Sequence, residues 1–235
     1  MPARRRSRLV SILARLARTT GRVTPPPVRD PYRLILWEQV AYLTDDATRL
    51  KAFRLLESEV GTEPGSITAA PFVTLKMVTR AGGSIGAELR AKRIRFVAER
   101  VLDRWDGDLW PVTRLPFEDA VRELMRYPSI GRPAAERILL LAGTHRPLAL
   151  ESNGVRVLLR LGYGRDLGRY DKTYGAVQAA AALEIPDREP PRINAHFVLR
   201  AHGHSICKRT APSCTRCPVL TECPTGRAQS SAPTT

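Results

Sequence analysis

The segment Tyr127-Pro128-Ser129-Ile130-Gly131 joins two stretches with helical spacing, Phe117–Arg126 and Pro133–Gly143. A tight turn ending in glycine presents backbone N–H groups at the start of the next helix, where they can bind a phosphate. Pro133 suits the first turn of that helix, because the donor it lacks would have no intrahelical partner there. An ordinary connection between two helices would look the same. The segment therefore predicts a helical hairpin, with phosphate binding as one of two interpretations.

Helical spacing continues outward from the hairpin through most of the chain. Apolar residues recur at intervals of three and four, and few stretches show the alternation typical of strands. The other expected helices are Asp30–Leu43, Lys51–Val60, Ile67–Val78, Ala87–Trp105, Val155–Leu161, Tyr174–Leu183 and Ile193–Gly203. We therefore predict an all-α fold.

The charge balance favours an acidic partner. The chain has 38 Lys+Arg against 23 Asp+Glu, a formal net charge of +15, and nucleic acid is the first partner that such a charge suggests. No apolar run approaches the roughly 20 residues of a membrane-spanning helix, and no secretory cleavage pattern follows the N-terminus. We expect a cytoplasmic monomer, nucleoid-associated if the source is bacterial, with no membrane partner.

Residues 1–23 carry seven arginines and no acidic residue. Four apolar residues there fall on one face of a helix, which Thr24-Pro25-Pro26-Pro27 would end. These four are Leu9, Ile12, Leu13 and Leu16. Such a helix could dock on the fold, lie along DNA, or be an Arg-rich transit peptide.

Four cysteines follow the spacing Cys207-x6-Cys214-x2-Cys217-x5-Cys223. Nothing marks the chain as secreted, which argues against disulfides. Structural zinc usually has two short cysteine pairs, and only one is present here. One short pair with two longer arms fits a larger iron–sulfur cluster better. Zinc and disulfides stay open as alternatives.

Taken together, the hairpin, an acidic residue about twenty positions later and this cysteine spacing resemble the endonuclease III and MutY superfamily of DNA glycosylases, across residues 28–224. The resemblance implies a two-domain helix-hairpin-helix fold and a 4Fe–4S cluster on the four cysteines. It also implies a partner, double-stranded DNA with a damaged or mismatched base that is flipped out. The DNA-binding residues that it implies are Tyr42, Pro128, Ser129, Ile130, Gly131 and Arg132. Tyr42 could instead be a core aromatic.

Two segments resemble the MutY and thymine-mismatch branch. In Asp30–Glu38, Glu38 falls on the catalytic glutamate, and in Glu151-Ser-Asn153-Gly-Val-Arg156-Val, Glu151 stands where that branch has aspartate. The implied roles are Glu38 as acid or water-positioning base, Glu151 as stabiliser of an oxocarbenium-like sugar and Asn153 as holder of the loop or water. From the residues alone, Glu38 could equally form an ion pair with an arginine, and Glu151 could simply cap a helix.

Departures from the family carry expectations too. Pro133 stands where endonuclease III has its Schiff-base lysine, so we predict a monofunctional glycosylase that leaves an intact abasic site. The longer Glu151 could shift the pocket, be tolerated, or abolish activity. MutY enzymes that act opposite 8-oxoguanine have an added C-terminal domain, and the chain ends soon after Cys223, so another mismatch or modified base is expected. A rival interpretation is a non-catalytic protein that binds lesions or abasic sites.

The resemblance also predicts the domain boundaries. Residues 1–24 form a basic helix or arm, 45–144 a helical bundle with the hairpin, 25–44 plus 145–224 the cluster domain, and 225–235 a disordered tail. Glu38 and Glu151 would face a cleft between the domains. His202 and His204 could form a metal pair or serve packing.

Overall fold

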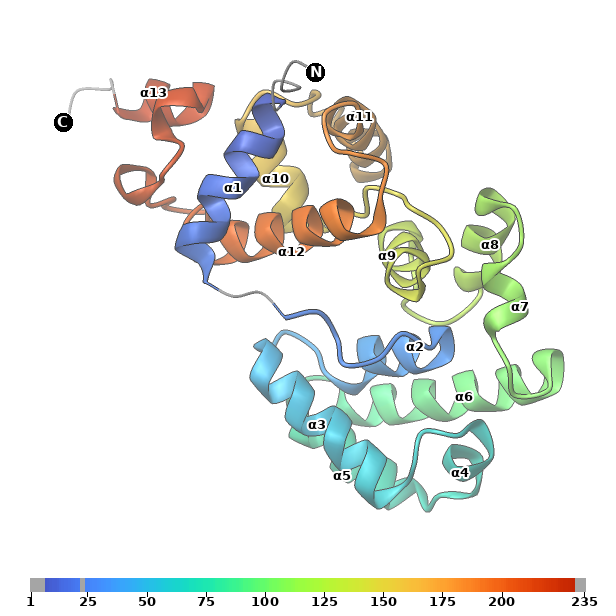
Figure 1. Cartoon of the computed structure of the whole chain (residues 1–235). Helices are drawn as coiled ribbons and strands as arrows, with labels where there is room; N and C mark the ends of the chain where they lie inside the picture. The colour runs from blue at the N-terminus through green and yellow to red at the C-terminus, as the bar shows by residue number, and fades with distance from the viewer. Residues whose placement is uncertain (1–6, 22–23, 231–235) are drawn as a thin grey trace. The chain divides into compact units, whose positions relative to one another are not determined.

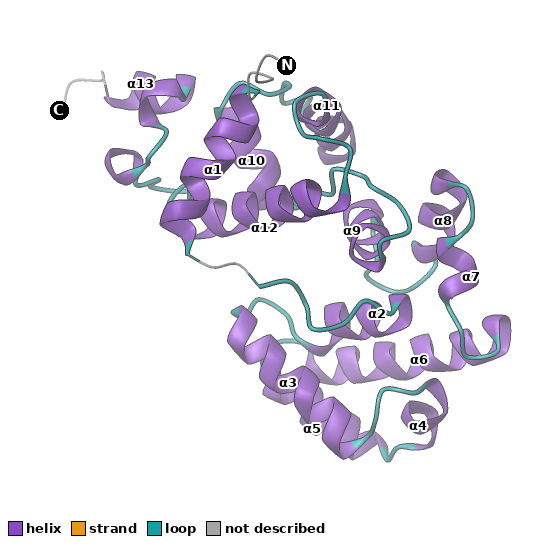
Figure 2. Cartoon of the chain, viewed as in Figure 1, coloured by secondary structure: helices purple, strands orange, loops and turns teal. Residues whose placement is uncertain are grey.

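The computed structural model describes residues 7–21 and 24–230 (Figure 1). Within these ranges every regular element is a helix, and Figure 2 contains no strand. The predicted all-α class is therefore confirmed. The chain forms two compact units. We call Pro26–His145 the hairpin unit, and the described residues of Met1–Pro25 and Arg146–Thr235 the cysteine unit.

The hairpin unit is built around a long central helix, α6, against which α2, α4 and α5 pack. Ile94, Val97 and Val101 recur along α6 at intervals of three and four, which brings them to one buried face. The helices of this unit are α2 (Pro31–Val40), α3 (Asp46–Glu59), α4 (Pro64–Ala69), α5 (Phe72–Ala81), α6 (Ala87–Trp105), α7 (Trp110–Thr113), α8 (Phe117–Leu124) and α9 (Arg132–Ala142).

Helix α2 begins where the sequence predicts and ends earlier. The Asp30 carboxylate accepts a hydrogen bond from Arg33 N at 2.8 Å, and Pro31 lies in the first turn. The helix stops at Val40 rather than Leu43. Ala41 is extended and Leu43 has φ +50°. The end is set by tertiary packing, because Gly82 lies directly against the Val40 carbonyl.

The cysteine unit combines an N-terminal helix with the C-terminal part of the chain. Its elements are α1 (Arg8–Thr20), α10 (Ser152–Arg160), α11 (Tyr170–Ala182), α12 (Glu189–Ser205), the 3₁₀ turns η1 (Cys214–Arg216) and η2 (Leu220–Glu222), and α13 (Pro224–Ser230). Helix α10 packs most extensively on α12. Gly203 permits this close approach, because a Cβ there would lie 2.7 Å from the Asn153 Cβ.

Helix α1 is docked on the fold, which is one of the three interpretations left open. It packs along α12, and its apolar stripe from Leu9 to Leu16 is almost fully buried. Its basic residues reach the cysteine segment. Arg8 Nη2 donates to the Glu222 carbonyl at 2.9 Å, and Arg15 forms an ion pair with the Glu222 carboxylate.

Two of the expected boundaries differ from the structure. Residues 26–44 pack into the hairpin unit rather than with the cysteines, because α2 buries its apolar residues against α3, α6 and α9. The segment 225–230, expected to be disordered, belongs to α13, which Pro224 begins. The remaining expectations for residues 1–6, 22–23 and 231–235 lie outside the described residues.

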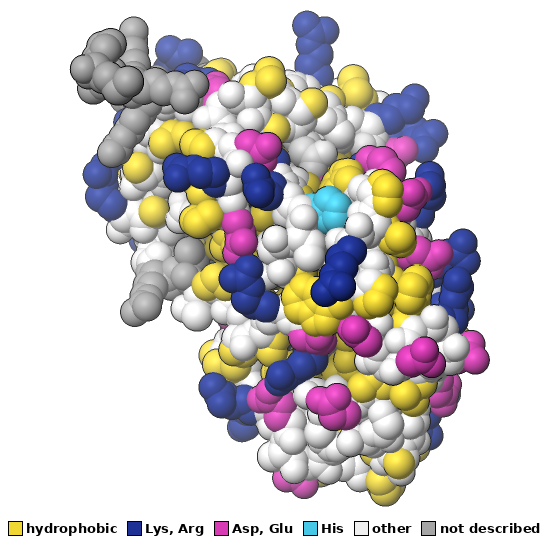
Figure 3. All heavy atoms as spheres, turned by 45° about the vertical axis from the view of Figure 1, so that its right-hand side comes forward, with side chains coloured by type: hydrophobic (Ala, Val, Ile, Leu, Met, Phe, Trp, Pro, Cys, Tyr) yellow, Lys and Arg dark blue, Asp and Glu magenta, His cyan; other side chains and the backbone are white. Residues whose placement is uncertain are grey.

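The face drawn in Figure 3 carries charges of both signs. On the face shown in Figure 3, Asp and Glu side chains are interspersed among the Lys and Arg side chains. Many arginines therefore have a carboxylate nearby, which bears on how they can bind an anion. No helix in the described part of the chain has the length and apolar character needed to cross a bilayer.

Candidate active site

The turn between α8 and α9 forms a tight hairpin. Ile130 N donates to the Tyr127 carbonyl at 3.2 Å, and both side chains are buried, which pins the two sides of the turn. Ser129 at the exposed tip has φ +63°. Gly131 is the N-cap of α9, and its carbonyl accepts from Ala135 N at 3.0 Å. The first N–H groups of α9 have no intrahelical acceptor and can bind an anion.

Glu38 lies near the end of α2 and faces α9. Its Oε2 is 2.5 Å from Arg137 Nη2, and the two side chains are 22% and 17% exposed. Glu38 therefore forms an ion pair with an arginine, as one of its two interpretations from the sequence expected. The next residue, Gln39, is buried and donates through Nε2 to the Pro128 carbonyl of the hairpin. Two consecutive residues thus join α2 to α9 and to the turn before it.

The C-terminal end of α2 is held by an arginine from α3. Arg49 Nη1 donates to the Trp37 carbonyl at 2.7 Å, and its guanidinium lies 6.0 Å from the Trp37 ring centroid. A cation at this end offsets the negative end of the helix dipole. Arg49 therefore fixes the turn of α2 that carries Glu38.

Tyr42 is exposed, at 53%, so it is not a core aromatic. Its backbone N–H donates to the Gly82 carbonyl at 3.3 Å. A second loop thus lies beside it, ending in Ile85, which is 59% exposed. The buried guanidinium of Arg90 donates to the carbonyls of Gly83 and Ile85 and holds this loop in place. Exposed apolar side chains on two braced loops are suited to contact with an unpaired or stacked base.

Glu151 is the N-cap of α10 in the cysteine unit. Its Oε1 accepts from Asn153 N at 2.9 Å and from Gly154 N at 3.1 Å, and its Oε2 accepts from Asn153 Nδ2 at 3.0 Å. This carboxylate therefore caps α10, as one of the two interpretations of Glu151 from the sequence expected. Asn153 Oδ1 accepts in turn from Arg156 Nη2 at 2.6 Å. Arg156 Nε donates to the Cys207 carbonyl at 3.0 Å, so a chain of hydrogen bonds connects Glu151 to the cysteine segment.

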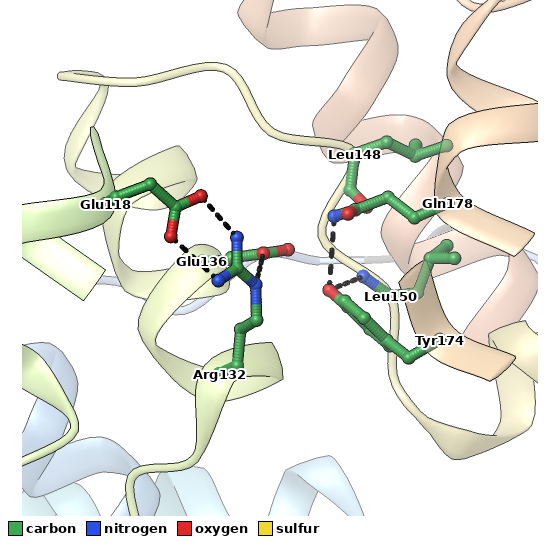
Figure 4. A network of polar contacts seen from close by, with 7 residues as sticks. All are labelled: Glu118, Arg132, Glu136, Leu148, Leu150, Tyr174 and Gln178. Carbon is green, nitrogen blue, oxygen red and sulfur yellow. Dashed lines mark hydrogen bonds and ion pairs between the residues drawn. The ribbon is translucent and has the colours of Figure 1, made fainter. Parts of the chain in front are cut away.

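The extended stretch before Glu151 is held by side chains from α11 (Figure 4) and by one from α12. Gln178 Nε2 donates to the Leu148 carbonyl at 3.1 Å, and Leu150 N donates to the Tyr174 hydroxyl at 3.3 Å. His196 Nδ1 lies 2.9 Å from the carbonyl of the residue between them. These contacts satisfy a buried, non-helical backbone and fix the point from which the Glu151 side chain extends.

Arg132, predicted to bind DNA, is paired with two carboxylates (Figure 4). Nη1 and Nη2 lie 2.9 and 2.7 Å from the two oxygens of Glu118 on α8, and Nε lies 2.8 Å from Glu136 Oε1. The Arg132 hydrogen bonds lower the pKa of Glu118, and the same contacts raise the pKa of Arg132. Phosphate binding by Arg132 must therefore compete with an existing pair.

The four cysteines line one cavity of about 30 Å³. All are free thiols, so the disulfide alternative is wrong. Burial raises the pKa of the Cys217 thiol, so a bound cation would be needed to hold it as thiolate. In the described part of the chain, no three His, Cys, Asp or Glu side chains are placed to hold a single metal ion. Whether these thiols bind an iron–sulfur cluster or a zinc ion stays a prediction.

An arginine and a backbone N–H also face this cavity. Arg160 Nη1 lies 3.2 Å from Cys207 Sγ, and Gly226 N lies 3.4 Å from Cys223 Sγ. They could offset the negative charge of cluster thiolates. His202 is buried beside Cys217, with its Nε2 3.7 Å from the sulfur, whereas His204 is exposed. The structure does not bring the two histidines together as a metal pair.

Comparisons with known proteins agree with this geometry. No family model matches the chain. Endonuclease III of Thermotoga maritima is 26% identical over 195 residues, which cover 83% of this chain and 83% of that protein. Among solved structures, a non-covalent endonuclease III–DNA complex has a TM-score of 0.72 at 24% identity, covering 95% of this chain and 97% of that chain. A thermostable thymine-DNA glycosylase has a TM-score of 0.73 at 20% identity, covering 94% and 95%.

The chain has the fold of the helix-hairpin-helix DNA glycosylases and resembles endonuclease III in sequence. The two structural likenesses concern its fold, which extends over nearly the whole chain. DEMETER-like protein 3 of Arabidopsis thaliana is 25% identical over 150 residues, and the match spans only 14% of that longer protein. Placement within the MutY and thymine-mismatch branch stays a prediction.

The resemblance to the superfamily did not identify which residues contact the predicted site residues. Arg137, Gln39 and Glu118 were not singled out, although each contacts a predicted site residue or the hairpin. No local pattern marks them, because each pair joins two different elements. Glu38 lies in the hairpin unit and Glu151 in the cysteine unit, and a shared cleft between them stays a prediction.

Proposed function

We propose that this protein is a base-excision DNA glycosylase that hydrolyses the N-glycosidic bond of a flipped damaged or mismatched base. The observation that carries the proposal is the link between Glu38 and the hairpin. The carboxylate pairs with Arg137 of α9, and the adjacent Gln39 holds the Pro128 carbonyl. A hairpin that seats a DNA phosphate would thereby set the position of the carboxylate near the bound nucleotide.

Glu38 acts on the base or on the attacking water. The contact with Arg137 orients the carboxylate, so that it can position and deprotonate a water as the sugar–base bond breaks. Protonation of the leaving base by Glu38 would require the pair with Arg137 to loosen first. Glu151 supplies negative charge that stabilises the oxocarbenium-like sugar, and Asn153 holds its Oε2 by a side-chain hydrogen bond.

The reaction leaves an intact abasic site. Pro133, in the first turn of α9, has no amine that could form an imine with the sugar. Arg132 beside it is a permanently charged guanidinium and is not a nucleophile. Tyr42 enters the space vacated by the flipped base, a role supported by its exposure and by the loop packed beside it.

A 4Fe–4S cluster bound by Cys207, Cys214, Cys217 and Cys223 would hold the loop that they span as a rigid DNA-contacting element. Arg160, which lines the cavity, and Arg8 of α1 both donate hydrogen bonds to backbone carbonyls of this loop. Iron and zinc content and visible absorbance test the assignment. About four irons per chain in a brown protein supports it, and a colourless protein with zinc overturns it.

The deciding experiment is base release from a duplex panel carrying uracil, thymine and adenine mismatches and oxidised and alkylated bases. Each reaction is read with and without alkali. Strand breaks that appear only after alkali, on one member of the panel, support a monofunctional glycosylase and name its substrate. Breaks without alkali, in protein free of nuclease, would refute the absence of lyase activity.

A non-catalytic lesion-binding protein is the second candidate. Its support is that Glu38 and Glu151 are both engaged, one in an ion pair and one as a helix cap. Tight binding to an abasic-site analogue with no release of any base would favour this function.

A further inference from the structure

Arg132 uses two sides of its guanidinium for two different carboxylates. Nε contacts Glu136, whose side chain is fully buried within α9. The Nη1 and Nη2 fork contacts both oxygens of Glu118, whose side chain is 59% exposed on α8. The ring of Phe117 lies 5.8 Å from the guanidinium carbon and helps to hold its plane. One contact is therefore internal and the other faces solvent.

The two contacts have different physical consequences. Separating a fully buried carboxylate from its cation is strongly destabilising, so the Nε–Glu136 contact is costly to break. An exposed ion pair contributes little to stability, because water screens it. Glu118 can therefore leave Arg132 at small cost while Glu136 keeps the guanidinium in place.

The fork that Glu118 occupies has the geometry for phosphate. Arginine binds carboxylate and phosphate in the same bidentate manner, through two parallel N–H groups. Arg132 is also the first residue of α9, directly after the hairpin. A phosphate bound at the N-terminus of α9 would therefore lie close to the fork.

We infer that Glu118 occupies the phosphate-binding fork of Arg132 in the free protein and that a backbone phosphate of duplex DNA displaces it on binding. Glu118 thus lowers the affinity of the hairpin for DNA, both by occupying the fork and by repelling the phosphate that replaces it. This inference rests on the proposed function, in which the hairpin binds DNA.

The test measures binding of an undamaged duplex over a salt series. Glu118→Gln removes one charge and frees the fork. Asp119→Asn is the matched control, because it removes the same charge one residue later on α8, where Asp119 pairs with Arg122. The second set is Arg132→Gln and the double variant Glu118→Gln/Arg132→Gln.

We expect Glu118→Gln to bind about three- to tenfold more tightly with an unchanged slope of log K against log salt, because the same phosphate contact forms in both complexes. Arg132→Gln should flatten that slope by about 0.9, the value for one lost phosphate contact. Asp119→Asn should change affinity less than twofold and leave the slope unchanged. The double variant should bind the duplex with the same affinity as Arg132→Gln alone, because the higher affinity of Glu118→Gln depends on Arg132.

Equal effects of Glu118→Gln and Asp119→Asn would overturn the inference and indicate a general field effect. The inference would also be overturned if Glu118→Gln raised DNA affinity by the same factor in the Arg132→Gln background as in the wild type. Thermal unfolding checks each variant, and Glu118→Ala replaces Glu118→Gln if the latter is unfolded. A wild-type protein that neither binds duplex DNA nor releases a base refutes the proposed function as well. One that does both, with no difference between the two α8 variants, refutes only this inference.

Discussion

Arg137 of α9 and Glu38 of α2 form an ion pair 99 positions apart in the chain, with Nη2 and Oε2 separated by 2.5 Å. The pair lies one residue from the Gln39 contact with the hairpin carbonyl of Pro128. A carboxylate that the superfamily resemblance marks as catalytic is thus attached to the helix that follows the hairpin. Any shift of the hairpin on binding a phosphate would be transmitted to this carboxylate.

Glu38→Gln should abolish base release while leaving DNA binding intact. The amide keeps the size of the side chain and can still accept from Arg137, but it cannot take or supply the proton. We expect a fall of about 10²- to 10⁴-fold in the single-turnover rate, the usual contribution of a general acid or base. Glu57→Gln, which removes a comparable ion pair with Arg33 in the same unit, is the control. A Glu38→Gln rate within twofold of wild type would contradict the assignment.

Changes at Glu151 should separate its capping role from its chemical role. Aspartate is a good N-cap, so Glu151→Asp should keep the free energy of unfolding within about 0.5 kcal/mol, whereas Glu151→Ala should lose about 1 kcal/mol. Because the carboxylate is retained, Glu151→Asp should also keep base release within tenfold. Glu151→Ala should lose about a hundredfold or more, as for a lost electrostatic stabiliser. Full activity in folded Glu151→Ala would reduce the residue to a cap.

Pro133→Lys should introduce lyase chemistry. The position lies in the first turn of α9, where lysine fits as well as proline. Its amine can form an imine with the opened abasic sugar, so borohydride should trap a covalent protein–DNA complex that wild type does not form. Pro133→Gln is the control, because it removes the proline without adding an amine. Trapping of the wild type would contradict the monofunctional assignment.

Arg160→Gln should loosen the cysteine loop. Arg160 Nη1 donates to the Lys208 carbonyl at 2.8 Å and contacts Cys207 Sγ at 3.2 Å. Without these contacts the bound cluster should decay faster under air, measured as loss of visible absorbance and release of iron. Arg165→Gln, on the exposed loop after α10, should decay like wild type. Equal decay of the two variants would show that Arg160 does not stabilise the loop.

Stability should fall above pH 10 because of Tyr127 in the hairpin. Burial raises the pKa of its hydroxyl from the ordinary 10.0 to about 12. The folded protein then holds this proton more tightly than the unfolded chain, so the contribution is intact below pH 10 and is lost between pH 10 and 12. Between pH 9 and 11, urea unfolding should show wild type losing about 1.4 kcal/mol relative to Tyr127→Phe. A parallel decline of both proteins would contradict this.

Much of the fold could be predicted because its signals are local. Capping of α2 by Asp30 and the apolar stripe of α1 depend on residues within a few positions of each other. The hairpin and the cysteine spacing are equally local. Their agreement with the superfamily pattern was sufficient to name the fold. The α13 helix was missed, because its small polar residues carry no apolar period and Gly226 instead packs against Leu220.

The sequence by itself determined that this protein is all-helical, that it has a hairpin resembling that of the helix-hairpin-helix DNA glycosylases, and which residues are candidates for its site. Only the tertiary structure decided their partners: Arg137 for Glu38, Glu118 and Glu136 for Arg132, and the backbone of α10 for Glu151. The physical reason is that helix period and capping act over a few residues, whereas an ion pair requires two distant elements to pack in one register. Among 38 basic residues, no sequence pattern selects the one that packing brings to a given carboxylate.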